Sequence, residues 1–534
     1  MQCDPELWKH APGRKYETIE NERFMLWFSG IAAYMQDRAC INDAQEIAAL
    51  FCAGELDFNR LHGFYSLVLF DKREMCHYFW GDNSGSQYFF ADMEENCFSD
   101  SFLHLLRARK GRLSPCFEGI AQLLSDQHFG TETPVKGIFI TDPDNIYRFS
   151  AGKVESISKK LLPLNKCEGT ELSPLMEALC GAAKESRIGA VCTGGTDSRL
   201  VLAHLSRLGQ KPPLIITGHK DNPDVALAVK IADTLGLELS IVDPTAKEEG
   251  WLEKALEFSD GRYDSVLSYR HLQVMNWAES KNISCLFGGV GGEYYKDSFC
   301  FALRYPSLLF SHSPRAVFGK MVEKRMRLPR WASTELISAR NSFIESCLAH
   351  MGDFEEKGPV RCVFNRMGMQ IMRHRCGLIT HAFAGRCTRV DPLMDRELVS
   401  RQSRFSPLRF LMCHWHRKEI HRACPALSDI PTDQGFSCTV RPTGFTSESA
   451  RKIIRWAKLV LLHFGLLKKK STPAYWDNDY DFAKDSVEFH KAFRLCQELG
   501  IIAEDFTEKD VASSQVGNII LLGQLFSIGD RQNP

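Results

Sequence analysis

The chain has 534 residues, more than one hydrophobic core usually supports, so we expect two domains, with three as the alternative. Its hydrophobic fraction of 44% and charged fraction of 25% are typical of a soluble globular protein. The 66 Lys and Arg residues balance the 66 Asp and Glu residues, which excludes a global basic field, and we expect no nucleic-acid partner.

The 19 cysteines are scattered singly and form no CxxC pair, which favours buried free thiols in a reducing compartment over disulfides or zinc. Around Cys413, His414 and His416 we expect a helix with mixed faces, with metal ligation as the alternative. No basic segment precedes an apolar run at the N-terminus, and no uncharged apolar stretch reaches the roughly 20 residues of a membrane helix. We therefore expect a cytoplasmic protein without a membrane span, in which residues 459–467 form an amphipathic helix.

Residues 1–165 contain apolar and aromatic runs separated by polar turns, a pattern that predicts strands. Such runs lie at 64–70, 76–80 and 87–90, and two shorter ones flank a turn within 137–148. We expect a mostly antiparallel sheet domain of the α+β type here.

From residue 166 to 534 the pattern changes, and apolar strands alternate with helices as in parallel α/β folds. Strands are expected at 189–192, 213–217, 237–242 and 285–287, and helices at 199–208 and 224–235. From about residue 311 onward we expect a helical part with no strong strand signal.

Residues 193–198, TGGTDS, connect an expected strand to an expected helix. Glycines let backbone N–H groups approach an anion closely, and a helix N-terminus adds unpaired donors and positive dipole. The GK[ST] ending of a Walker A loop is absent. We expect Asp197 to cap the helix or hold a metal, and Arg199 to add positive charge at the helix start. An ordinary strand–helix turn is the alternative for the two glycines alone.

A second glycine-rich segment, residues 287–295 (FGGVGGEYY), follows another expected strand. Alone it is compatible with a flexible loop. Beside the first segment it becomes informative: the family resemblance described next implies a second close approach of the backbone to phosphate here, with Glu293 as the carboxylate that holds Mg²⁺.

The string [S/T]-G-G-x-D-S after a strand is similar to the loop of PP-loop ATP pyrophosphatases, which form adenylates and release pyrophosphate. With the later segment, the chain resembles asparagine synthetase over almost its whole length: 193–198 is similar to the family's SGGLDS, and 287–294 to its SGEGSDE. The resemblance implies ATP and Mg²⁺ as cofactors. The residues implied to bind ATP or pyrophosphate are Thr193, Gly194, Gly195, Asp197, Ser198, Gly289, Gly291 and Gly292, and those implied to bind metal are Asp197 and Glu293.

Residues 390–395, VDPLMD, are similar to the family's VPFLD segment. The family places a Glu, and an Asp four residues later, beside the acceptor carboxylate; Asp260 and Asp264 have this spacing, with solvated turn acids as the alternative. The family also has a Lys in an RPKxGF-like segment, which the matching residues 430–436 (IPTDQGF) lack. We expect Arg441 or another basic residue to substitute, or adenylation to be impaired.

The N-terminal domain resembles a class II, Ntn-type glutaminase in residues 62–67, 81–90 and 98–100, but it departs from that family at three chemical roles. Position 2 is Gln, with Cys3 one residue later, whereas the family needs a processed N-terminal cysteine. His62 replaces the oxyanion-hole Asn, and Gly81 replaces an Arg. We therefore expect no glutaminase activity.

β-Lactam synthetases and lasso-peptide macrolactam synthetases share a degenerate N-terminal domain, and in both an amine of the substrate attacks the adenylate. The resemblance therefore implies an ATP-dependent carbon–nitrogen ligase that forms AMP and pyrophosphate. Its expected substrate is a small-molecule, peptide or glycan precursor bearing a carboxylate and an amine, with a partner protein delivering it as a further expectation. The alternatives are an ammonia-dependent amidotransferase and a catalytically dead, nucleotide-binding regulatory homologue.

Overall fold

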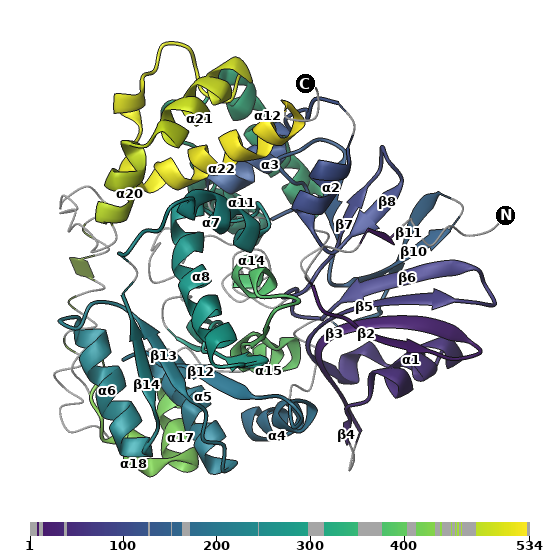
Figure 1. Ribbon diagram of the computed structural model, residues 1–534, viewed down its shortest axis with the longest axis vertical. Coiled ribbons are helices and arrows are strands. Elements are labelled where there is room, and N and C mark those ends of the chain that lie inside the picture. The colour runs from purple at the N-terminus through teal and green to yellow at the C-terminus, as the bar shows by residue number, and fades with distance from the viewer. Residues whose placement is uncertain are drawn as a thin grey trace.

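The computed structural model of the protein (Figure 1) describes most of the chain. The described residues are 8–9, 14–36, 40–109, 111–125, 129–150, 152–162, 171–243, 245–296, 314–350, 376–402, 413–432, 438–439, 450, 454, 457–458, 461 and 477–530.

The N-terminal part forms two sheets, drawn in purple and blue in Figure 1. Among the described residues, the larger sheet has the order β11-β10-β6-β5-β3-β2 with β4 paired to β3, and all its pairings are antiparallel. The smaller has the order β1-β8-β7-β9, in which β1 and β8 are parallel. The mostly antiparallel arrangement expected from the sequence is confirmed. The strands are β1 (Trp8–Lys9), β2 (Glu17–Glu20), β3 (Phe24–Met35), β4 (Cys40–Ile41), β5 (Leu61–Asp71), β6 (Cys76–Gly81), β7 (Phe90–Asp92), β8 (Cys97–Ser99), β9 (Ile138–Ile140), β10 (Asn145–Ser150) and β11 (Lys153–Ser158).

The strand expected at 87–90 is an exception. β7 begins only at Phe90, because the backbone N–H of Gln87 donates to the Asp82 carboxylate and that of Phe89 donates to Thr141 Oγ1. These bonds commit the backbone to a loop before the sheet begins. Helices α1 (Ala44–Ala53), α2 (Phe102–Ala108) and α3 (Phe117–Leu124), with the 3-10 turn η2 (Phe58–Arg60), accompany the sheets.

The second half contains a parallel sheet with the order β14-β13-β12-β15-β16 among the described residues, which confirms the expected change of fold type. Its strands are β12 (Ile188–Val191), β13 (Leu214–Thr217), β14 (Leu239–Val242), β15 (Cys285–Phe287) and β16 (Thr388–Val390). The helices that accompany them are α4 (Leu172–Ala182), α5 (Thr196–Arg207), α6 (Pro223–Leu235), α7 (Trp251–Ser259) and α8 (Ser265–Ser280). Local sequence explains such elements: α6 has Asn222 as its N-cap, Pro223 in its first turn and left-handed Gly236 at its end.

The later part is largely helical, as expected, but it also supplies β16 and thereby completes the parallel sheet. Its elements are the 3-10 turn η3 (Gly292–Tyr295), α11 (Pro314–Arg325), α12 (Thr334–His350), α14 (Gly377–Ala382), η6 (Pro392–Met394), α15 (Arg396–Gln402), α17 (His414–Ala423), α18 (Pro425–Ser428), α20 (Asp477–Lys484), α21 (Val487–Glu498), η7 (Glu508–Asp510) and α22 (Ser513–Asp530). The helix expected around His414 is present, whereas residues 459–467 lie almost entirely outside the described part.

The buried core continues across both halves. One cluster combines Ile31 and Phe64 of the N-terminal sheet with the parallel strands and with α5. A second surrounds α22 and includes Leu103 of α2 together with Met275 of α8. The expected boundary at residue 165 falls outside the described residues.

Candidate functional site

The strand–loop–helix unit expected at residues 193–198 lies at the carboxyl edge of the parallel sheet. β12 runs between β13 and β15, and α5 begins at Thr196. The hydroxyl oxygens of Thr193 and Ser198 are 2.8 Å apart, and Ser198 Oγ accepts a hydrogen bond from the Thr193 backbone N–H. Gly195 is the N-cap of α5, and no side chain of the described residues caps this helix start. The first turn therefore keeps the backbone donors with which helix N-termini bind anions.

The second glycine-rich segment packs directly on this loop. An ideal Cβ on Gly289 would lie 2.4 Å from the backbone nitrogen of Ser198, and one on Gly292 would lie 2.0 Å from Asp197 Cγ. Neither distance leaves room for a side chain. Gly291 has a φ of +95° and lies against the backbone of Leu393. The structure thus brings together the two segments that the sequence singled out.

Asp391 holds the second segment in place. Its buried carboxylate accepts a hydrogen bond of 3.1 Å from the Val290 backbone N–H, and Arg389 Nε donates to it over 2.9 Å. Asp391 belongs to the segment 390–395 that resembles the asparagine synthetase family. It therefore shapes the glycine-rich segment through a backbone contact.

Asp197 is surrounded by two basic groups that the sequence analysis did not assign to the site. Lys296 Nζ lies 2.6 Å from Asp197 Oδ2, and His416 Nε2 lies 2.9 Å from Asp197 Oδ1. Burial by itself would raise the pKa of Asp197, but the charge of Lys296 and the contact with His416 outweigh it and hold the pKa below its ordinary value. Burial also lowers the pKa of His416 itself, so Lys296 supplies the lasting positive charge at this carboxylate. Burial likewise opposes the charge of Lys296, yet its carboxylate neighbours outweigh burial and raise the pKa of Lys296.

A sequence signal existed for Lys296, because it closely follows Glu293 in the glycine-rich segment. His416 was considered only as an alternative metal ligand and not as a neighbour of this loop. Its position depends on the packing of α17: Trp415, the residue before it, stacks on Tyr295 of η3 with ring centroids 4.4 Å apart.

The expected role of Arg199 requires a correction. Its guanidinium is buried. It donates to the carbonyl oxygens of Ile430 at 2.6 Å, Pro431 at 2.9 Å and Gly194 at 3.1 Å. Arg199 therefore connects the start of α5 to the segment after α18, and its positive charge interacts with those carbonyl oxygens.

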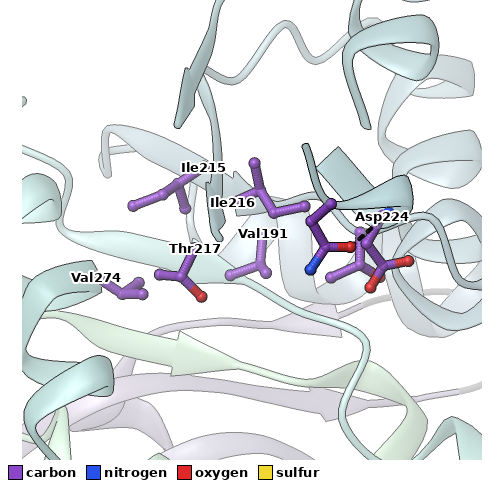
Figure 2. A pocket seen from close by; sticks show the side chains of 8 residues that line it. Val191, Ile215, Ile216, Thr217, Asp224 and Val274 are labelled. Carbon is purple, nitrogen blue, oxygen red and sulfur yellow. Dashed lines mark hydrogen bonds between the residues drawn. The ribbon is translucent and has the colours of Figure 1, made fainter. Parts of the chain in front are cut away.

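A cavity of about 240 Å³ opens beside the loop, and Figure 2 shows the side chains around it. Its walls come from the carboxyl ends of β12 and β13, from the start of α6 and from α8: Val191, Thr193, Ile215, Ile216, Thr217, Asn222, Asp224 and Val274. An ideal Cβ on Gly194 would lie 2.6 Å from Asp224 Oδ1, so the loop and the cavity share a boundary. Crevices at the carboxyl ends of parallel strands are the usual ligand sites of such sheets.

Asp260 and Asp264 lie elsewhere and act as helix caps. Asp260 is buried, and its carboxylate accepts from Ser101 Oγ at 2.5 Å and from the backbone N–H groups of Phe102 and Leu103. Asp264 is the N-cap of α8 and accepts from two backbone N–H groups of its first turn. Neither residue lines the cavity. Their contacts fit structural roles, although both are buried and therefore differ from solvated turn acids.

Arg441 lies outside the described residues, as do positions 433–437, which include most of the segment that lacks the family Lys. The structure thus leaves the expected role of Arg441 as a prediction.

The N-terminal departures from the glutaminase pattern have structural counterparts. His62 Nδ1 lies 3.0 Å from Asp395 Oδ2, so the residue that the resemblance placed at the oxyanion-hole position is paired with the later part of the chain. An ideal Cβ on Gly81 would lie 1.7 Å from the Gln87 carbonyl oxygen, so this backbone has no room for the family's Arg. Cys3 lies outside the described residues.

Asp197 and Glu293 are the two carboxylates that the sequence predicted to hold Mg²⁺. Both oxygens of Asp197 face a basic group, whereas Glu293 is exposed on η3. The described residues contain no group of three or more His, Cys, Asp or Glu side chains arranged for a metal. Mg²⁺ that accompanies a nucleotide needs only one or two carboxylates besides the phosphates, so Glu293 fits that use better than Asp197.

Comparison with protein-family models and with curated proteins gave no match. Within the described ranges, no helix is both long enough and apolar enough to cross a membrane.

Proposed function

We propose that the chain is an ATP-dependent carbon–nitrogen ligase of the PP-loop, asparagine synthetase-like type. The observation that supports this most is the direct contact between the two glycine-rich segments, through Gly289 and Gly292, beside a cavity at the carboxyl edge of the parallel sheet. The cavity is smaller than the roughly 300–1,000 Å³ of drug-sized ligand pockets, so it suits the base and sugar of ATP while the phosphates lie along the loop.

In the proposed reaction, a substrate carboxylate oxygen forms a bond to the α-phosphorus of ATP. The bond from that phosphorus to the oxygen bridging it to the β-phosphorus breaks, and pyrophosphate leaves with that electron pair. An amine then attacks the acyl carbon, AMP departs and the amine loses a proton. Mg²⁺, when bound, would neutralise phosphate charge. The backbone N–H groups of 194–198 would bind the phosphates, and Glu293 would hold the ion.

The amine is proposed to belong to the substrate, as in the β-lactam and macrolactam synthetases, with the N-terminal part as a scaffold. The His62–Asp395 pair and the closed backbone at Gly81 favour this over glutamine-dependent amidotransfer. An ammonia-dependent amidotransferase would use the same ATP site.

A nucleotide-binding regulatory protein is the second candidate. It is favoured by one observation: the carboxylates of Asp260 and Asp264, the expected acceptor-site acids, cap the starts of helices. Such a protein would bind ATP at the same site but would not catalyse adenylation or amide formation.

Phosphorus NMR on the full chain with ATP, Mg²⁺ and a panel of peptide, amino-acid and glycan carboxylates distinguishes these candidates. We expect AMP and pyrophosphate in a carboxylate-dependent reaction. ADP and phosphate would contradict the proposal, and ATP binding without any turnover across the panel would favour the regulatory protein.

A further inference from the structure

We propose that Lys296 is the cation that binds the pyrophosphate portion of ATP in this chain, and that Asp197 holds it at the loop until the nucleotide arrives. This inference rests on the proposed function and assigns to it a residue outside the segments where the asparagine synthetase resemblance placed the missing charge.

The position of Lys296 is fixed by its neighbours along the chain. It directly follows η3, whose Tyr295 is buried, stacks on Trp415 and donates a hydrogen bond to the Leu393 carbonyl oxygen at 3.1 Å. Gly292 of the same turn touches Asp197. A well-packed turn therefore positions the Lys296 ammonium at the loop, where Nζ lies 2.6 Å from Asp197 Oδ2.

Accessibility separates Lys296 from the other basic groups at the loop. The Lys296 side chain is 20% exposed and Asp197 is 17% exposed, whereas His416 is 0% exposed. Arg199 is buried, and its guanidinium donates hydrogen bonds to carbonyl oxygens. Of these three basic residues, Lys296 is the one that solvent and an incoming phosphate can reach.

The charges around the loop require such a cation. Asp197 and Glu293 are both negative where a polyphosphate would bind, and two like charges near an anion oppose its binding. An ammonium that leaves Asp197 for a phosphate oxygen exchanges one charge-assisted hydrogen bond for another. His416 remains beside Asp197 after this exchange, with its Nε2 2.9 Å from Asp197 Oδ1, so the carboxylate keeps a polar neighbour.

The test compares the affinities of the full-length protein for ATP, AMP and inorganic pyrophosphate, measured by calorimetry with Mg²⁺. Lys296→Met should weaken binding of ATP and of pyrophosphate tenfold or more, about 1.4 kcal/mol, and change the affinity for AMP less than twofold. Lys296→Arg should retain most of the affinity for ATP, because it keeps the charge. Lys281, a partly exposed residue whose Nζ lies 2.7 Å from Glu238 Oε1, provides the matched control, Lys281→Met.

Unchanged ATP affinity in Lys296→Met, with tight ATP binding by the wild type, would overturn this inference and leave the ligase proposal standing. An equal loss of AMP and ATP affinity would also overturn it, because Lys296 would then act through the fold. A wild-type protein that binds neither ATP nor AMP would overturn both proposals. Circular dichroism and the thermal midpoint of each variant establish that the comparison is made on folded protein.

Discussion

Gly289 is the residue at which the two glycine-rich segments approach most closely through their backbones. Its missing side chain would lie 2.4 Å from the Ser198 nitrogen and 2.6 Å from the Asp197 carbonyl carbon. Both are backbone atoms at the start of a helix and cannot turn aside as a flexible side chain could. Glycine is required here by close approach, without any unusual φ angle.

We therefore expect Gly289→Ala to separate the segments, weaken ATP binding at least tenfold and lower the free energy of unfolding by about 1–3 kcal/mol. Calorimetry with ATP and urea unfolding measure the two effects. Gly319→Ala in α11 is the control, because its Cβ would lie 3.4–3.5 Å from Leu348, an ordinary contact. An ATP affinity equal to that of the wild type in Gly289→Ala would show that this contact does not shape the nucleotide site.

The sequence identified the loop residues of the candidate site better than the charged groups around them. The glycines and hydroxyl residues of 193–198 could be recognised from the sequence because their roles depend on local structure: a strand end, a tight turn and a helix start. The direction of the Arg199 side chain depends on carbonyl oxygens from a distant segment, and His416 depends on the packing of α17. No local pattern encodes either position.

At the scale of elements, short apolar runs predicted the strands β5, β6, β12, β13 and β15 well, because such strands are buried on both faces. No apolar run indicated β3, the long strand that pairs along the whole of β5, since polar and small residues interrupt its apolar pattern. Strand β16 was not expected either, because its sequence is only Thr388, Arg389 and Val390. The neighbouring strand β15 makes this segment a strand through parallel pairing.

The start of α2 shows how one element can depend on a residue far away in sequence. Asp260, at the end of α7, accepts hydrogen bonds from the first two backbone N–H groups of α2 and from Ser101, the N-cap of that helix. A carboxylate in this position also complements the helix dipole. Burial raises the pKa of Asp260, although Arg14 and these hydrogen bonds oppose the shift.

Asp260→Ala should consequently lower the free energy of unfolding by about 2–3 kcal/mol, since it leaves two backbone donors and a hydroxyl buried without their acceptor. Chemical denaturation measures this loss, and Asp221→Ala, which removes an exposed carboxylate, is the control. Asp260→Asn should lose less, because an amide oxygen still accepts. A variant with wild-type stability but no ligase turnover would return Asp260 to the acceptor site that the family resemblance suggested.

At the scale of the whole molecule, the N-terminal sheet and the parallel sheet are joined by polar contacts as well as by a shared core. Lys15 donates its backbone N–H to the Gly385 carbonyl oxygen, and Arg14 Nη2 lies 3.2 Å from His381 Nε2. His62 of β5 reaches Asp395, which follows η6 and lies in the same segment as Asp391. The N-terminal part is thus connected, through residues 391–395, to the segment that holds the glycine-rich loop.

The His62–Asp395 pair makes this connection sensitive to pH, and the sign follows from the pKa of His62. Burial opposes the imidazolium, but the Asp395 carboxylate outweighs burial and raises the pKa above its ordinary value of 6.5. A raised pKa in the folded state means that folding favours the protonated form. The stabilisation is therefore complete below the pKa of the unfolded chain and is lost as the pH rises through the folded-state pKa.

A double-mutant cycle of His62→Gln and Asp395→Asn, followed by urea unfolding, should give a coupling of about 1.5–3 kcal/mol near pH 5.5. Repeating the cycle at about pH 7 and about pH 8.5 should show that coupling falling steadily as the imidazolium loses its proton. A coupling that stays constant over this range would mean that neutral His62 holds the two halves as well as the charged form does, through a hydrogen bond alone.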